Sequence, residues 1–194
     1  MNSRCVMVVL AGMMAFAMNA GAETYQVDPS HSTVGFSVKH LAISTVKGVF
    51  TNFGGTIEFD AKKPEASKAA GTVQTASINT HIEARDKHLR GPDFFDAAKY
   101  PEIKFETLSA RKDGEEWVVK GNFTLHGVTR EIELRGTVEG PVKDPWGKTR
   151  IGLSATTAIN RQDYGLLWSQ KLDAGGLVVG DVVKIELQIE AVAK

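Results

Sequence analysis

The sequence predicts an all-β fold in which about eight antiparallel strands close a barrel, with one helical excursion. Three observations predict it. Apolar and polar residues alternate with a period of two along most of the chain from Thr24 onward. Turn residues separate these runs at hairpin spacing, and one stretch alone, residues 81–100, turns to a helical period.

The alternating runs are expected to be strands with one apolar face and one solvent-exposed polar face. Around Phe36, for example, Val34 and Val38 share its face while Thr33 and Ser37 point the other way. The same alternation recurs in the runs 55–59, 103–107, 117–125, 131–139, 151–159 and 184–190.

Turn signals stand between these runs. Asp113-Gly114 and His126-Gly127 are predicted two-residue hairpin turns, because glycine tolerates a positive φ angle. Residues 144–147 are expected to form a wider loop, and Gly180-Asp181 precedes the last strand.

The helical stretch is predicted from His81 to about Tyr100. Gly91-Pro92 should interrupt it, with Phe94 and Phe95 in a second short helix. Two neighbouring stripes of the first helix carry Ile82, Asp86 and Leu89, and His81, Arg85 and His88.

A sandwich or a closed barrel would remove the exposed edges of so many strands. Strands of about ten residues, each about 33 Å long, favour the barrel. Gly48, Gly121 and Gly136 fall in phase with apolar neighbours, so they should face inward. They either leave room for a ligand or let the strands bend, and the sequence leaves both alternatives open.

Residues 1–22 are interpreted as a cleavable secretory signal. A basic residue, Arg4, precedes an apolar run from Cys5 to Met18, and small residues follow at positions 20–22. The run is shorter than the roughly 20 residues of a transmembrane helix, so we expect an exported protein that does not span the membrane. Cleavage would also remove Cys5, the one cysteine of the chain.

Residues 23–194 are expected to form one domain. Loss of Arg4 lowers the basic residues from 23 to 22 against 23 acidic ones, a net charge of about −1. Because no block of lysine or arginine stands out, we expect no nucleic-acid partner. The oligomeric state stays open, a homo-oligomer included.

Several motifs in order along the chain resemble the YceI-like family. They are Asp28-Pro-Ser-His31-Ser32 with Phe36 and His40, Val46-Lys-Gly48-Val-Phe50, Ser77-Ile-Asn79-Thr80, Arg85-Asp86-Lys-His88-Leu-Arg90-Gly-Pro-Asp93-Phe94-Phe95-Asp96, Lys99-Tyr100-Pro101, Leu125-His126-Gly127-Val-Thr129 and Asn160-Arg161-Gln-Asp163-Tyr164-Gly165. Asn79 stands where the family pattern often has Asp.

The resemblance implies an exported, lipocalin-like barrel that binds a polyisoprenoid or a related long-chain lipid, without a cofactor. An apolar lumen would hold the tail, and a few polar groups at one end would hold the head. The predicted tail contacts are Val34, Phe36, Val38, Val46, Phe50, Phe94, Phe95, Ile103 and Phe105. The predicted head or mouth contacts are His40, Arg85, Asp86 and His88. Alternatively, the apolar residues fill a solid core, and Arg85 and Asp86 only anchor the helix.

Two other functional classes stay open. An enzyme acting on such a lipid would use Arg85, Asp86 and His88, although no nucleophile elbow, phosphate loop or dinucleotide motif is present. A structural or interaction module would bind no lipid at all. We predict no catalytic residues and no metal site, since the histidines lack the spacing of metal ligands.

Overall fold

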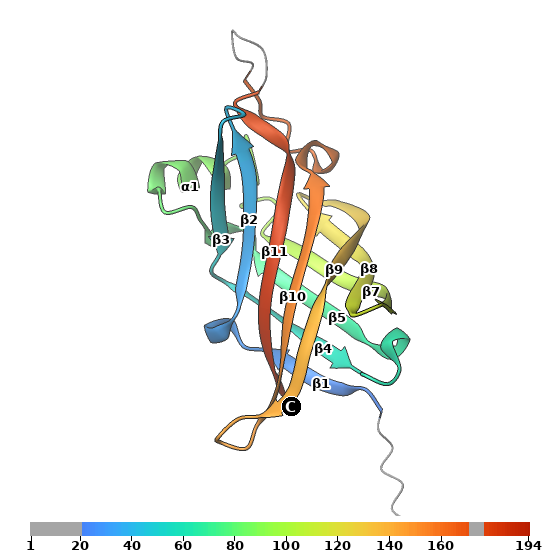
Figure 1. Cartoon of the computed structure of the whole chain (residues 1–194). Coiled ribbons are helices and arrows are strands. Elements are labelled where there is room, and N and C mark those ends of the chain that lie inside the picture. Colours follow the sequence, from blue (N-terminus) through green and yellow to red (C-terminus); the bar gives the residue numbers. More distant parts are fainter. Residues whose placement is uncertain (1–20, 171–176) are drawn as a thin grey trace, which may run out of the picture.

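The computed structural model describes residues 21–170 and 177–194, which form a strongly curved sheet around an apolar interior (Figure 1). The strands are β1 (Glu23–Val27), β2 (Thr33–His40), β3 (Ser44–Phe50), β4 (Phe53–Phe59), β5 (Lys68–Gln74), β6 (Ile78–Asn79), β7 (Glu102–Asp113), β8 (Glu116–Leu125), β9 (Val128–Lys143), β10 (Thr149–Asn160) and β11 (Val179–Ala193). The one α-helix in these residues is α1 (Glu83–Arg90). Short 3-10 turns are η1 (Pro29–His31), η2 (Pro64–Ala66), η3 (Thr75–Ser77) and η4 (Arg161–Tyr164).

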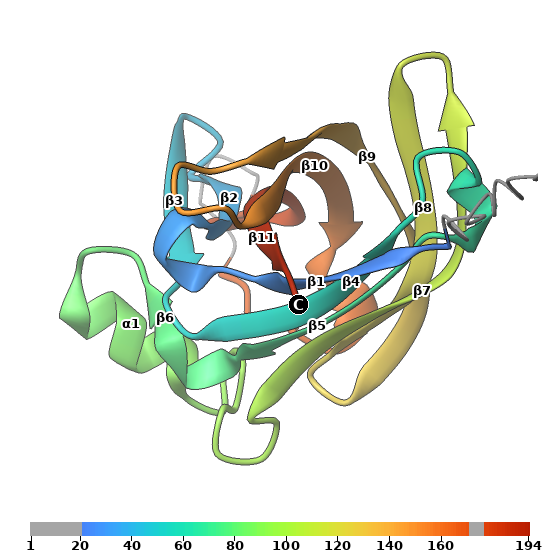
Figure 2. The same ribbon diagram turned by 90° about the horizontal axis from the view of Figure 1, so that it is seen from below.

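Eight of the described strands close the predicted antiparallel barrel, in the order β1-β4-β5-β7-β8-β9-β10-β11. Pairing between β1 and β11, from Tyr25 with Ala193 to Val27 with Ala191, completes the ring. Seen along its length, the strands surround a central space and α1 lies outside them (Figure 2). The predicted fold class is confirmed.

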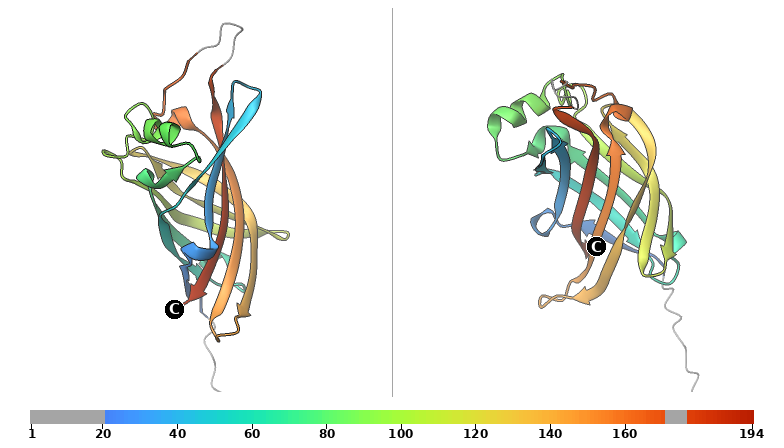
Figure 3. Two further views of the ribbon diagram at one scale, coloured as in Figure 1. Left: turned by 90° about the vertical axis from the view of Figure 1, so that its left-hand side faces the viewer. Right: turned by 45° about the horizontal axis from the view of Figure 1, so that its top comes forward.

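The remaining strands form an extension at one end of the barrel. β11 is long, so its residues 183–188 pair with β2 while residues 191–193 pair with β1. η1 turns the chain from β1 onto β2, β2 pairs with β3, and β3 pairs with β6 at two positions. The extension and α1 lie at one end, called here the helix end, away from the loop that joins β9 and β10 (Figures 1 and 3).

Turn chemistry explains the hairpins. His126 and Gly127, with φ angles of 52° and 75°, join β8 to β9 as predicted. A side chain at Gly127 would also meet the Tyr100 ring 2.6 Å from its Cβ. At the hairpin between β7 and β8, Asp113 pairs with Glu116, so the turn is Gly114-Glu115, one residue later than predicted.

The helical prediction was too long. α1 ends at Arg90, and residues 91–100 form successive turns instead of a second helix around Phe94 and Phe95. Pro92 has no amide hydrogen to donate, and Asp96 adopts a left-handed φ of 43°, which interrupts a regular helix. No helix in residues 21–170 and 177–194 is long and apolar enough to cross a membrane.

Two clusters of buried side chains fill the two ends of the barrel. The helix-end cluster consists of Phe50, Ile78, Ile103, Leu125, Ile159, Tyr164 and Leu166, with Leu89 of α1 and Phe95 packed against it. The opposite cluster consists of Tyr25, Ile57, Phe59, Trp117, Ile151 and Ala191. Buried side chains therefore gather towards each end of the barrel.

Candidate ligand-binding cavity

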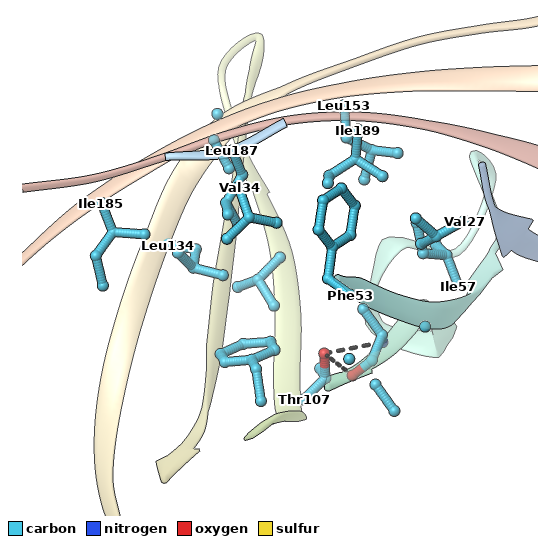
Figure 4. A pocket seen from close by; sticks show the side chains of 18 of the residues that line it. Val27, Val34, Phe53, Ile57, Thr107, Leu134, Leu153, Ile185, Leu187 and Ile189 are labelled. Atoms are coloured by element: carbon cyan, nitrogen blue, oxygen red, sulfur yellow. Dashed lines mark hydrogen bonds between the residues drawn. The ribbon is translucent and has the colours of Figure 1, made fainter. Parts of the chain in front are cut away.

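A cavity of about 260 Å³ lies inside the barrel and is lined by members of both clusters. Its volume is close to the lower end of the roughly 300–1,000 Å³ of small-molecule sites. Leu153, Leu187 and Ile189 of β10 and β11 lie along one wall, with Val27 and Ile57 beside them (Figure 4). The surface that the wall offers is almost wholly apolar.

An inward hydroxyl of this wall is already satisfied. Thr107 Oγ1 donates to the Ala69 carbonyl at 3.1 Å and accepts from the Ala69 amide at 2.9 Å, beside a bulge in β7 (Figure 4). Because its bonds go to the backbone of β5, Thr107 is not left to bind a ligand's polar group. The cavity therefore suits an apolar tail, while a polar head would have to lie outside it.

The Phe53 side chain shapes the cavity. It extends from β4 into the space between Ile57 on its own strand and Leu153 and Ile189 on the opposite wall (Figure 4). A rigid aromatic ring at this place divides the space that a tail would occupy.

The three predicted inward glycines do not leave open lumen. A Cβ at Gly48 would lie 2.5 Å from the Phe36 ring, and one at Gly121 would collide with the Phe105 ring. At Gly136 it would collide with the backbone of β10. The first two glycines make room for aromatic rings of this chain, and the third allows close approach of two strands.

Five of the nine predicted tail contacts line the cavity, namely Val34, Phe36, Phe50, Ile103 and Phe105. The other four lie away from its wall. Val38 and Val46 pair with each other across β2 and β3. Phe95 packs its ring edge against Phe50, with centroids 5.9 Å apart, and Phe94 is buried against Trp168. Contact of any of the nine with a ligand stays a prediction.

The four predicted head contacts do not line the cavity. Asp86 is 3% exposed and accepts hydrogen bonds from the Thr80 amide and hydroxyl. Arg85 donates to the Thr80 hydroxyl at 2.7 Å and to the Thr80 carbonyl at 2.8 Å. Both side chains therefore tie α1 to the residues that precede it, as the anchoring alternative expected.

His88 and His40 lie farther out. His88 is half exposed, contacts Asp93 through Nε2 at 3.0 Å and packs edge-on against the rings of Phe94 and Trp168. His40 ends β2 opposite Ser44. Their role in head-group binding stays a prediction.

A second hollow, of about 630 Å³, lies on the other side of the wall formed by β4, β5 and β7. It shares residues 53–56, 70–72 and 104–105 with the inner cavity. Its remaining lining is polar and consists of Gln26, Asn52, Gln74, Glu102 and Glu106. Lys104 pairs with Glu102 at 2.8 Å there, and its hydrogen bond lowers the pKa of Glu102.

Comparison with known proteins identifies the family of this chain. A family model described as the YceI-like domain matches residues 25–191. The chain belongs to the YceI-like family. Relatives include Protein YceI of Escherichia coli O157:H7, 39% identical over 161 residues that cover 82% of this chain and 84% of that protein. A UPF0312 protein of Pseudomonas savastanoi is 41% identical over 162 residues, with the same coverage.

Solved structures show the same YceI-like barrel. The YCEI protein of Campylobacter jejuni is 34% identical, has a TM-score of 0.69, and the match covers 80% of this chain and 90% of that chain. A polyisoprenoid binding domain from Saccharophagus degradans has a TM-score of 0.67 at 20% identity, covering 88% of this chain and 98% of that one. That similarity bears on the fold alone.

A network of charged side chains lies outside the inner cavity, where η1 meets β10 and β11. Arg150 donates to Asp28 at 3.1 Å, to Asp144 at 2.8 Å and to Glu190. The His31 hydrogen bond, followed by those from Ser30 and Arg150, holds the pKa of Asp28 well below its usual range. Asp28, His31 and Glu190 have the atoms to hold a metal ion, but Arg150 already supplies the cation that two of them bind.

A buried arginine anchors the YceI-like barrel near the helix end. Arg161 is 3% exposed and donates to the carbonyls of Gly180, Leu166, Trp168 and Val179 and to the carboxylate of Asp181. Burial lowers the pKa of Arg161, and Asp181 opposes the shift. It joins η4 and the loop after it to the start of β11.

Sequence reasoning missed several cavity residues of this YceI-like barrel. Phe53 is the most central, and its strand was expected to begin at Gly55. Two consecutive glycines disfavour a strand, so Gly54-Gly55 concealed the alternation of Phe53 with Ile57 and Phe59. Leu187 and Ile189 were recognised as one strand face, but the sequence does not show which inward positions lie beside empty space.

Proposed function

We propose that this chain is a binding protein for a polyisoprenoid or similar long-chain amphiphile, and that it holds the lipid tail in the barrel without chemistry. The apolar cavity between two packed clusters is the observation that carries the proposal. Val34, Phe36, Phe50, Ile103 and Phe105 are its proposed tail contacts. The family to which the chain belongs supports the class of ligand.

The physical chemistry of the wall fits this function. Each Å² of tail surface that leaves water contributes about 25 cal/mol before the entropy cost of binding. An enzyme acting on the lipid would use Arg85, Asp86 and His88, and none of the three lines the cavity. Arg85 and Asp86 are engaged with Thr80. This placement favours a carrier over an enzyme.

We propose a periplasmic location for the protein. The support is the signal-like residues 1–22 and the family to which the chain belongs. Residues 1–20 of this predicted signal lie outside the described residues. Cell fractionation and mass measurement of the mature N-terminus test both expectations, and an intact N-terminus in the cytosol would contradict them.

Cavity filling tests the binding function. The mature protein is incubated with geranylgeraniol, an isoprenoid alcohol, and the bound alcohol is quantified after gel filtration. We expect Leu187→Trp to reduce the retained alcohol at least about tenfold, because its larger side chain occupies the cavity.

Gln188→Trp is the matched control, since Gln188 is the next residue of β11 and is exposed. It should retain the alcohol at the wild-type level. Equal retention by wild type and Leu187→Trp would contradict binding in this cavity. Circular dichroism and thermal unfolding confirm that both variants remain folded.

A further inference from the structure

The barrel has a seam in its hydrogen bonding beside the first half of β4. β1 pairs with β4 only from Glu23 with Phe59 to Gln26 with Thr56. Beyond that point Val27 pairs with β11 and η1 leads the chain away onto β2. Residues 53–55 of β4 are therefore paired with β5 on one side and with no strand of the described residues on the other.

A glycine leaves this seam uncovered. Gly54 has open space around the position of its missing Cβ, with nothing within 4 Å. One side chain spans the edge, since Gln26 Nε2 donates to the Gly55 carbonyl at 2.8 Å.

Residues 53–56 beside the seam belong to the wall that separates the inner cavity from the outer hollow. Both are lined by residues 53–56 of β4, and the outer hollow also includes Gln26 and Asn52. Just inside, the Phe53 side chain extends into the cavity (Figure 4). The apolar interior and the polar exterior thus lie on the two faces of this wall, and the seam is at its β4 edge.

Among the described residues, a cluster of buried side chains lies towards each barrel end. At the helix end the buried rings of Phe50 and Tyr164 lie within one packed cluster, and Trp117 and Tyr25 belong to the other. A tail entering by either end would have to separate several buried side chains. At the seam it would displace one side-chain hydrogen bond and turn one ring.

We propose that the seam between Gln26 and residues 53–55 is the portal of the cavity, with Gln26 as its latch and Phe53 as its inner gate. The ligand's tail passes along the unpaired edge of β4, and its polar head remains in the outer hollow beside Gln26 and Asn52. This inference rests on the proposed function, because it assigns the route to the same cavity.

Exchange kinetics test the portal. Stopped-flow measurement with cis-parinaric acid, a fluorescent polyene fatty acid, gives association and dissociation rates for the mature protein. We expect Gly54→Phe to slow both rates by about tenfold or more with little change in Kd, since a side chain there covers the route without filling the cavity. Gln26→Ala should accelerate both rates several-fold.

Gly152→Phe is the matched control. Gly152 lies in β10, away from the seam, and the only atom near its missing Cβ is 3.9 Å away. It should exchange the probe at the wild-type rate. If Gly54→Phe binds as fast as Gly152→Phe, the portal is wrong and the tail enters by an end. A wild-type chain that does not bind the probe at all would contradict the proposed function itself, and the portal with it.

Discussion

At the scale of single residues, buried polar side chains join parts of the chain that are distant in sequence. Arg161 is the clearest case, because its guanidinium donates to four backbone carbonyls. Arginine suits this place, since its five N–H donors lie in a rigid plane. The family motif around Arg161 therefore has a structural explanation that involves no ligand.

Replacing Arg161 with methionine should lower the free energy of unfolding by about 3 kcal/mol or more, because several backbone carbonyls lose a charged donor at a buried position. Urea denaturation measures the difference. Arg111→Met is the control, since Arg111 is half exposed and forms a surface ion pair with Asp113, and its replacement should cost less than about 1 kcal/mol. Equal losses in both variants would contradict the anchoring role.

The charge network at Asp28 should make stability depend on pH. The folded protein lowers the pKa of Asp28, so the network stabilises the fold above the usual carboxyl pKa of about 4 and is lost as pH falls through the lowered value. We expect Asp28→Asn to show a smaller loss of unfolding free energy between neutral and strongly acidic pH than wild type. Thermal unfolding across that range measures it, and parallel curves would contradict the assignment.

At the scale of elements, the strands could be predicted because one face of each points inward and the other is exposed to solvent. Ile185, Leu187 and Ile189 form the inward face of β11. The predicted ends of elements were wrong where individual residues interrupt the apolar-polar pattern. A proline and a left-handed Asp96 ended the helical run early, and Gly54-Gly55 concealed the start of β4. An anchoring role for Arg85 and Asp86 was one of two alternatives that the sequence left open, and their common partner Thr80 was not predicted.

α1 provides a prediction at this scale. Asp86→Ala should lower the unfolding free energy by about 1–3 kcal/mol, because the buried Thr80 amide loses its acceptor. Hydrogen exchange should become faster in residues 78–90, while geranylgeraniol retention stays at the wild-type level. Lost retention with unchanged exchange would instead place Asp86 in the ligand site. Glu83→Ala, at an exposed position of the same helix, serves as the control.

At the scale of the whole molecule, closure of the barrel requires contacts between β1 and the end of β11, about as far apart as the chain allows. Period-two patterning predicts strands but not which ones pair, so the sequence did not predict the order of strands. Closure into a barrel was predicted from the edge argument, the strand length and the family resemblance. The cavity is harder to predict from the sequence than the order of the strands. It depends on whether rings such as Phe36 and Phe105 fill glycine positions or the lumen, which is decided by packing in three dimensions.

Native mass spectrometry of the mature protein, purified from the compartment in which it accumulates, tests the central proposal most directly. The bound material is then extracted with organic solvent and identified. We predict a mass excess of one ligand per chain, released as a long-chain isoprenoid or similar amphiphile, and its reduction in Leu187→Trp. A bare protein mass under the gentlest ionisation, together with no uptake of added geranylgeraniol, would contradict a lipid-binding function.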